Sequence, residues 1–189
     1  MIELHHHLAE PTELREYRNL HGGESWGDQA FIPIRTAVRR QLNLEQEGLC
    51  VYCESALDKD NGHVEHIQAK GKGGNPALTF VYENLAHSCS SSDHCGHHKL
   101  KQILPVEPRQ GCNRFFALSA LDGRLAPALG LNGGEGQQAI ESIRVLGLNH
   151  PSLAWQRKGL ADAIIFLRDN AEREAFLIGL PFRWSLRSL

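Results

Sequence analysis

Two pairs of cysteines bracket the middle of this 189-residue chain and limit what it can fold into. Cys50 and Cys53 are separated by two residues, whereas Cys89 and Cys95 are spaced more widely. Two thiolate pairs can surround one ion with four sulfur ligands in a tetrahedron, which is the coordination that zinc prefers. The sequence therefore predicts that these four cysteines hold a structural zinc ion, with a separate unit built between the pairs.

Other interpretations of the cysteines are weaker. Scattered buried cysteines would not cluster, yet the stretch from Cys50 to Lys99 holds four of the five cysteines and six of the eleven histidines. Disulfides would need an oxidising compartment, and the N-terminal segment has no apolar run of signal-peptide length. We interpret the remaining cysteine, Cys112, as a packing residue. We expect a cytoplasmic protein without a membrane segment.

The segment between the pairs contains residue types that hydrolytic chemistry uses. His66 is the candidate general base because imidazole titrates near neutral pH, and Glu65 offers a hard oxygen ligand for a divalent cation. In an extended strand these neighbours point to opposite faces, so they share a site only where the strand ends or bulges. Lys70 and Lys72 belong to a glycine-rich loop suited to phosphates, although such a loop is more often a solvated hairpin.

Between Cys50 and Lys99 the order of these motifs resembles the HNH endonucleases. The matching residues are His63-Val64-Glu65-His66-Ile67, then Asn84-Leu85, then Cys95 followed by Lys99. The resemblance implies an α+β fold with a ββα-metal core, a structural zinc knuckle, and flanking N- and C-terminal helices. It also implies that His66 deprotonates water, that Glu65 binds Mg²⁺ or Mn²⁺, and that Asn84 orients the catalytic loop.

One position departs from the family pattern. The family places a further metal ligand directly after the last zinc cysteine, where this chain has Gly96, which has no side chain. His97 and His98 follow at once, and because successive helical residues point about 100° apart, only one is expected to face the ion. His97 is favoured because it is one residue from the expected ligand position, and His98, which is two residues from it, is the alternative.

A narrower resemblance covers more of the chain. A leading helix, the motif from Cys50 to Glu54, and the segment from Leu146 to Arg157 are similar to retron-associated and Septu-type HNH proteins. Such proteins are nuclease subunits of bacterial anti-phage systems. The resemblance therefore implies cleavage of nucleic acid, with DNA favoured, beside an ABC/SMC-like ATPase partner. A retron reverse transcriptase and its DNA are further implied partners.

The overall charge limits how such a protein could hold DNA. The formal net charge is −2, whereas a lone nonspecific DNA-binding protein is usually basic. Contact with nucleic acid must therefore come from a local patch or from a partner. The candidate contacts are Arg35, Arg39, Lys70, Lys72 and Lys99. For the two arginines, a solvated helix face with ion pairs is an equal alternative.

Apolar patterning suggests three regions, namely an N-terminal arm and helix (1–48), a nuclease core (49–104) and a mainly helical region (105–189). The expected helices cover residues 13–19, 34–47, 137–146 and 153–176. A strand is expected over 62–68, and a small hairpin about Asp122-Gly123. The apolar C-terminal tail either packs back on the protein or docks a partner, with Phe182 and Trp184 as anchors.

Two functions other than catalysis fit parts of the sequence. A noncatalytic zinc module that binds nucleic acid would need the cysteines but not His66. An interaction subunit would use the C-terminal helices to regulate a partner. The adjacent Glu65 and His66, together with Asn84, favour an enzyme because a structural zinc module needs none of them. We therefore predict a metal-dependent HNH endonuclease.

Overall fold

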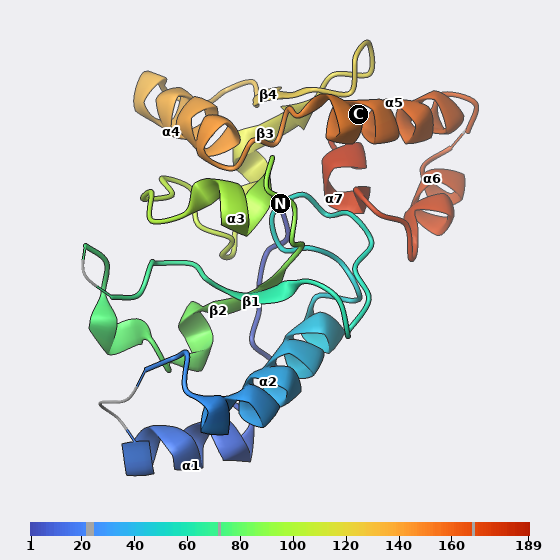
Figure 1. The fold of residues 1–189 in the computed structure, drawn as a ribbon. Helices are drawn as coiled ribbons and strands as arrows, with labels where there is room; N and C mark the ends of the chain where they lie inside the picture. The colour runs from blue at the N-terminus through green and yellow to red at the C-terminus, as the bar shows by residue number, and fades with distance from the viewer. Residues whose placement is uncertain (22–24, 72, 168) are drawn as a thin grey trace.

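The computed structural model describes residues 1–21, 25–71, 73–167 and 169–189, which form small sheets surrounded by helices. The hairpin of β1 (His63–His66) and β2 (Leu85–Ser88) and the short helix α3 (Cys95–Lys99) lie in the middle of the molecule (Figure 1). N-terminal helices lie on one side of them and the C-terminal region on the other. The fold is α+β, as predicted, and none of the described helices is long and apolar enough to cross a membrane.

Of the two N-terminal helices, α2 (Ile32–Glu45) packs against both strands of the hairpin, and α1 (Thr12–His21) packs against α2. These two helices confirm the predictions of helices over residues 13–19 and 34–47. Trp26 is buried between them and the strands, with its ring 4.6 Å from that of Phe31. This tryptophan therefore anchors the N-terminal arm. The turns with 3-10 geometry cover Gln29–Phe31, Pro76–Leu78, Tyr82–Asn84 and Cys112–Phe115.

The central hairpin is antiparallel, with Glu65 opposite Ala86 and His66 opposite Leu85. The observed β1 lies inside the predicted strand 62–68 because Gly62 has a φ of 71° and turns the chain. A side chain at Gly62 would have its Cβ 2.5 Å from the Ser88 carbonyl oxygen, so the close approach of the two strands requires glycine there.

The C-terminal region begins with the predicted small hairpin, in which β3 (Phe116–Leu118) pairs with β4 (Leu125–Pro127). Helix α4 (Gly133–Val145) starts earlier than the predicted residue 137. Its start is set by a capping box, since Asn132 Oδ1 accepts from Glu135 N and Glu135 Oε2 accepts from Asn132 N. This reciprocal cap draws the glycines at 133, 134 and 136 into the helix despite their low propensity.

The prediction of one long helix over 153–176 is wrong. The structure has two helices there, α5 (Pro151–Ile164) and α6 (Asn170–Leu177), followed by α7 (Arg183–Leu186). Asp169 starts α6 by accepting a hydrogen bond from Glu172 N at 2.8 Å. The apolar residues keep helical spacing across the break, so the pattern alone could not reveal it.

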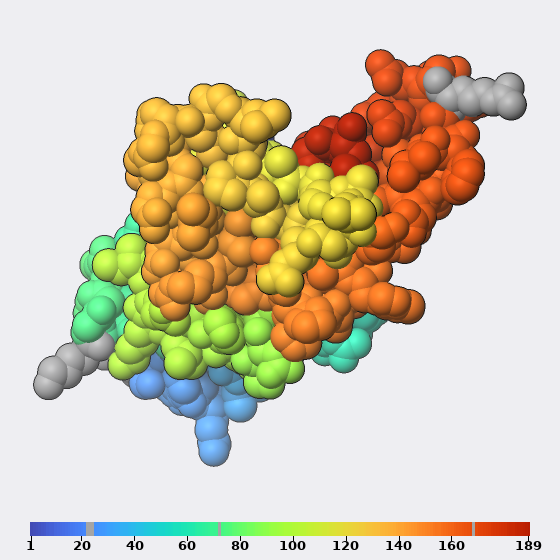
Figure 2. All heavy atoms as spheres, turned by 90° about the horizontal axis from the view of Figure 1, so that it is seen from above, coloured from blue at the N-terminus to red at the C-terminus, as the bar shows by residue number. Residues whose placement is uncertain are grey.

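The C-terminal tail packs back on the protein, which was one of its two predicted alternatives. Phe182 is buried, and Glu54, next to the first cysteine pair, accepts hydrogen bonds from Trp184 N and Ser185 N at 2.9 and 3.1 Å. Seen from above (Figure 2), the yellow to red surface of this C-terminal region covers most of the face, and the N-terminal segment shows only at the lower edge.

Candidate active site

Four sulfur atoms converge beside the central hairpin. The Sγ atoms of Cys50, Cys53, Cys89 and Cys95 all lie within 4.8 Å of one another, and none of the cysteines is in a disulfide. The Sγ atoms of Cys50 and Cys95 are 3.8 Å apart. Zinc–sulfur bonds of about 2.3 Å in a tetrahedron separate the sulfurs by about 3.8 Å. The cluster could therefore bind a metal such as zinc, as the spacing predicted.

The cysteine cluster is tied to the C-terminal region through Cys95 and Arg157. Cys95 N donates to the Leu146 carbonyl at 2.8 Å. Arg157 is fully buried, with Nη1 donating to the Leu148 carbonyl at 2.8 Å and Nε and Nη2 without a hydrogen-bond partner among the described residues. Burial lowers its pKa, and the charges of Glu54, Cys53 and Cys95 act against that shift. A guanidinium therefore lies within the electrostatic reach of the thiolates.

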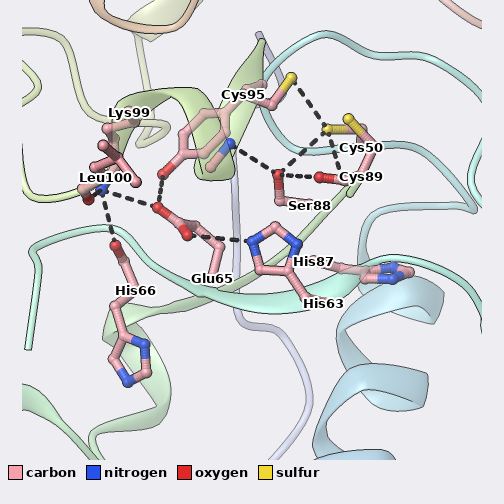
Figure 3. Close-up of polar contacts among 12 residues, drawn as sticks. Cys50, His63, Glu65, His66, His87, Ser88, Cys89, Cys95, Lys99 and Leu100 are labelled. Carbon is pink, nitrogen blue, oxygen red and sulfur yellow. Dashed lines mark hydrogen bonds and ion pairs between the residues drawn. The ribbon is translucent and has the colours of Figure 1, made fainter. Parts of the chain in front are cut away.

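Glu65 is held on the face of β1 that points toward α3 (Figure 3). Its Oε1 is 2.9 Å from the Lys99 ammonium and 3.3 Å from the Tyr52 hydroxyl, while Oε2 is 3.4 Å from His63 Nε2. Burial raises the pKa of Glu65, but the contact with His63 and the charge of Lys99 outweigh it and hold the pKa below its usual range. The carboxylate is therefore ionised and fixed in orientation.

His66 points to the opposite side of the strand from Glu65, as regular strand alternation requires (Figure 3). Its Nε2 is 3.0 Å from the Thr79 carbonyl, which can only accept, so Nε2 carries the proton and Nδ1 is the free base, 3.3 Å from Lys70 Nζ. Burial, followed by the charge of Lys70, lowers the pKa of His66 to about 4. The imidazole is therefore neutral at neutral pH.

Asn84 is the last residue of the segment that connects β1 to β2. Its Oδ1 accepts from Gln68 N at 2.9 Å, and its Nδ2 donates to the carbonyls of Gln68 and Leu78 at 3.0 and 3.3 Å. Asn84 is 2% exposed, and both its amide oxygen and its amide nitrogen are hydrogen-bonded. It fixes the start of the loop after His66 to the end of the same loop.

The two helix histidines point in different directions. His98 Nδ1 bonds to the Val145 carbonyl at 2.9 Å, so this side chain turns toward α4. His97 stacks on His63, with ring centroids 4.1 Å apart and planes 14° from parallel. A cavity of about 360 Å³ is lined by His63, Glu65, His66, Lys70, Gly96 and His97. Glu65 and His66 therefore reach one cavity from opposite sides of the strand, together with His97 and without His98.

A search of protein-family models finds no match to this chain. A protein of Vibrio cholerae serotype O1 biovar El Tor is 36% identical over 177 residues, which cover 88% of this chain and 85% of that protein. Its name assigns it to retron Vc95 and to the HNH endonucleases. The chain belongs to the HNH endonuclease family.

The basic side chains predicted to contact nucleic acid in this HNH endonuclease have different surroundings. Arg35 and Arg39 are half-exposed and line a second cavity of about 360 Å³, next to His63. Lys70 is half-buried beside His66, and Lys72 lies outside the described residues. Lys99 is 0% exposed and its ammonium bonds to Glu65 and to the His66 carbonyl, so in this structure it does not face a nucleic acid.

Sequence reasoning gave Tyr52, His63 and Arg157 no role at the candidate site, and it gave Lys99 a different one, contact with nucleic acid. Tyr52 and His63 contact Glu65, Lys99 forms an ion pair with it, and the charge of Arg157 acts on Cys53 and Cys95. Tyr52 lies between Cys50 and Cys53, and His63 lies two residues before Glu65, so proximity in sequence is the signal that could have found them. No local pattern marks Lys99 or Arg157 as buried.

Proposed function

We propose that this protein is a metal-dependent endonuclease that hydrolyses phosphodiesters of nucleic acid, with DNA favoured, at the cavity between β1 and α3. The observation that carries the proposal is the pairing of an ionised Glu65 with a neutral His66 at one cavity. A fixed carboxylate and a free base are the two groups that metal-assisted hydrolysis needs. Strands β1 and β2 and helix α3 would form the ββα-metal core of the family.

His66 is the proposed general base. Its Nδ1 is an acceptor on a buried, neutral ring whose other nitrogen is held by the Thr79 carbonyl. It can therefore take a proton from water without first losing one of its own, once water replaces Lys70 Nζ, which lies 3.3 Å from Nδ1. The water oxygen forms the new bond to phosphorus, and the bond from phosphorus to the 3′-oxygen breaks. Asn84 keeps the loop that carries Thr79 at a fixed distance from the strand.

The residues at the cavity fit a hard divalent cation. Mg²⁺ or Mn²⁺, when bound, supplies charge that polarises the phosphate and neutralises the leaving oxygen. Glu65 Oε2 is the carboxylate oxygen that the ammonium of Lys99 leaves available. Of the two helix candidates, His97 lies at this cavity and His98 does not, so we propose that His97 is the helix residue beside the metal and that His98 has no part in the site.

The cysteine cluster has a separate, structural role in this proposal. A zinc ion with four thiolate ligands has no open position for water or substrate, so it cannot take part in hydrolysis. Zinc would instead fix the knuckle, the end of β2 and the start of α3 in one place. Because His66 and Glu65 lie on the strand paired with β2, loss of the ion should disorder the catalytic cavity.

A path for the nucleic acid is proposed across His63. The cavity with Arg35 and Arg39 and the cavity with Lys70 both include His63, so basic groups lie on either side of the proposed metal site. Phosphates on neighbouring nucleotides could contact these groups while one phosphate occupies the catalytic cavity. Lys72 remains a sequence-based candidate on the same loop as Lys70.

We further propose that the protein is the nuclease subunit of a bacterial anti-phage system related to the retron-associated and Septu types. The name of the Vibrio cholerae relative supports a retron setting. The proposed partners are an ABC/SMC-like ATPase, a retron reverse transcriptase and the DNA that it makes. Trp155 and Phe166 are 78% and 82% exposed and offer apolar surface to a partner protein. The net charge of −2 favours a partner that supplies part of the contact with DNA. Co-purification from the native host tests this assembly.

The cleavage experiment uses zinc-loaded protein with duplex DNA, single-stranded DNA and RNA in Mg²⁺ or Mn²⁺. Wild type should cleave at least one substrate, whereas His66→Ala should not, although it keeps its zinc. His5→Ala, which removes an exposed imidazole, is the matched control. Equal cleavage by wild type and His66→Ala would show that the hydrolysis comes from elsewhere, and binding without cleavage by both would favour a noncatalytic zinc module.

A further inference from the structure

We propose that His63 is a ligand of the catalytic metal and that, with Glu65, it replaces the ligand missing at Gly96. This inference rests on the proposed function, because it concerns which side chains hold the ion that the reaction uses. His63 precedes the carboxylate by two residues on β1, so both side chains lie on the same face of the strand.

The space at Gly96 is the first observation. A Cβ built there would lie 2.6 Å from Glu65 Oε2 and 2.8 Å from His63 Nε2. Real Cβ atoms do not approach polar atoms so closely, so a residue with a side chain would displace both groups. The strand-borne carboxylate and imidazole thus meet at the place where a helix-borne side chain would begin.

The two oxygens of Glu65 give the second observation. Oε1 is engaged by Lys99 and Tyr52, which leaves Oε2 as the oxygen for a cation. Oε2 and His63 Nε2 are 3.4 Å apart. Neighbouring ligands in an octahedron with bonds of about 2.1 Å lie about 3.0 Å apart, so one ion fits between them after a shift of about 0.4 Å. Two protein ligands leave positions for water and phosphate, as Mg²⁺ and Mn²⁺ sites require.

The position of the His63 ring is the third observation. Its Nδ1 is buried without a partner among the described residues, so Nε2 carries the polar contacts of this ring. His97 lies parallel to it at 4.1 Å. Ring nitrogens bind metals in the plane of the ring, so two parallel stacked rings cannot both aim at one ion. His97 therefore positions His63 by stacking, and His63 supplies the nitrogen.

The test measures binding of Mn²⁺ alone to zinc-loaded, full-length protein, by the loss of the free Mn²⁺ signal in electron paramagnetic resonance. Wild type should bind one Mn²⁺, and His63→Ala should bind it at least about tenfold more weakly, as loss of one of two protein ligands implies. His97→Ala should weaken binding by a smaller factor. The matched control His5→Ala should bind as wild type does.

A second variant tests the geometry without removing a ligand. Gly96→Ala adds one methyl group at the point where Glu65 Oε2 and His63 Nε2 meet, so it should also weaken Mn²⁺ binding. Gly136→Ala in α4 is its control, because a Cβ there would meet nothing within 4 Å. Zinc content and the thermal unfolding midpoint are measured for every variant, so that misfolding is distinguished from a lost ligand.

The outcomes separate this inference from the proposed function. If Glu65→Gln loses Mn²⁺ while His63→Ala and Gly96→Ala bind it as wild type does, His63 is not a ligand, and the metal-dependent nuclease still stands. If His97→Ala loses more affinity than His63→Ala, the helix supplies the ligand and the inference is overturned. If wild type neither binds Mn²⁺ nor cleaves nucleic acid, both proposals fall.

Discussion

Lys99→Met would remove a buried ammonium while keeping a side chain of similar length. Lys99 is 0% exposed, and its Nζ lies 2.9 Å from Glu65 Oε1 and 3.2 Å from the His66 carbonyl. Removing one member of a buried ion pair leaves the other charged and unpaired, which costs about 3–5 kcal/mol. With a urea m-value of about 2 kcal/mol/M, the unfolding midpoint should fall by about 2 M.

The pH dependence of this loss follows from Glu65. In wild type its pKa is held below the usual range by His63 and Lys99 against burial, so its contribution to stability is present above the unfolded pKa of about 4.3 and lost as pH falls. In Lys99→Met the contact with His63 remains but both contributions of Lys99 are gone, so we expect burial to raise the pKa of Glu65 above the unfolded value and the variant to lose stability as pH rises between the two. The difference between the two proteins should therefore grow from pH 5.5 to 7.5.

The assay is urea unfolding of zinc-loaded wild type, Lys99→Met, Glu65→Gln and the double variant. The double variant should recover at least half of the loss seen in Lys99→Met, because it leaves no buried charge unpaired. Lys99→Met should also need more Mn²⁺ for cleavage while binding DNA without metal as wild type does. A loss below about 1 kcal/mol, or weaker DNA binding with unchanged metal dependence, would refute the positioning role.

The remaining predictions concern zinc, the base and two other buried side chains. Cys53→Ser should lose the single tightly bound zinc, measured by elemental analysis, and unfold more readily, whereas Cys112→Ala should keep its zinc; zinc-free but fully folded wild type would contradict the assignment. Burial raises the pKa of Cys112 to about 12, so iodoacetamide at pH 7.5 should leave it unmodified in the folded protein, and rapid modification seen by mass spectrometry would count against its packing role. Because the pKa of His66 is about 4, cleavage should stay nearly constant from pH 7.5 to 6, with zinc content checked, and a tenfold fall per pH unit below 6.5 would indicate an unshifted base. Arg157→Met should keep one zinc but release it faster to a chelator, because a buried positive charge beside the thiolates is gone; an unchanged release rate would exclude that role.

Local spacing in the sequence was sufficient to predict several parts of the fold. The cysteine pairs, the strand through Glu65 and the turn at Gly123 each depend on neighbours within a few residues. For this reason the converging sulfurs, strand β1 and the β3–β4 hairpin agree with the expectation. The sequence predicted that only one of His97 and His98 faces the ion, but it could not decide which one. The reason is that α3 is short and begins at Cys95 with a φ of 66°.

Other parts could not be predicted because they depend on contacts between distant segments. Lys99 in a polar, histidine-rich helix looks like a solvent-exposed cation, and only the packing of α3 against β1 turns it toward Glu65. Arg157 lies on α5, and its surroundings depend on contacts with the Phe182 ring and the Leu148 carbonyl, which come from other segments. The break between α5 and α6 depends on the Asp169 cap, which competes with an unbroken apolar pattern.

The most direct test of the account is anomalous X-ray diffraction from crystals of the zinc-loaded protein soaked in Mn²⁺, recorded at the absorption edges of both metals. We expect a zinc peak among the four cysteine sulfurs and a separate manganese peak in coordination with Glu65 Oε2 and His63 Nε2. A manganese peak only at the cysteines, or none beside Glu65 at saturating Mn²⁺, would contradict a catalytic metal site at this cavity.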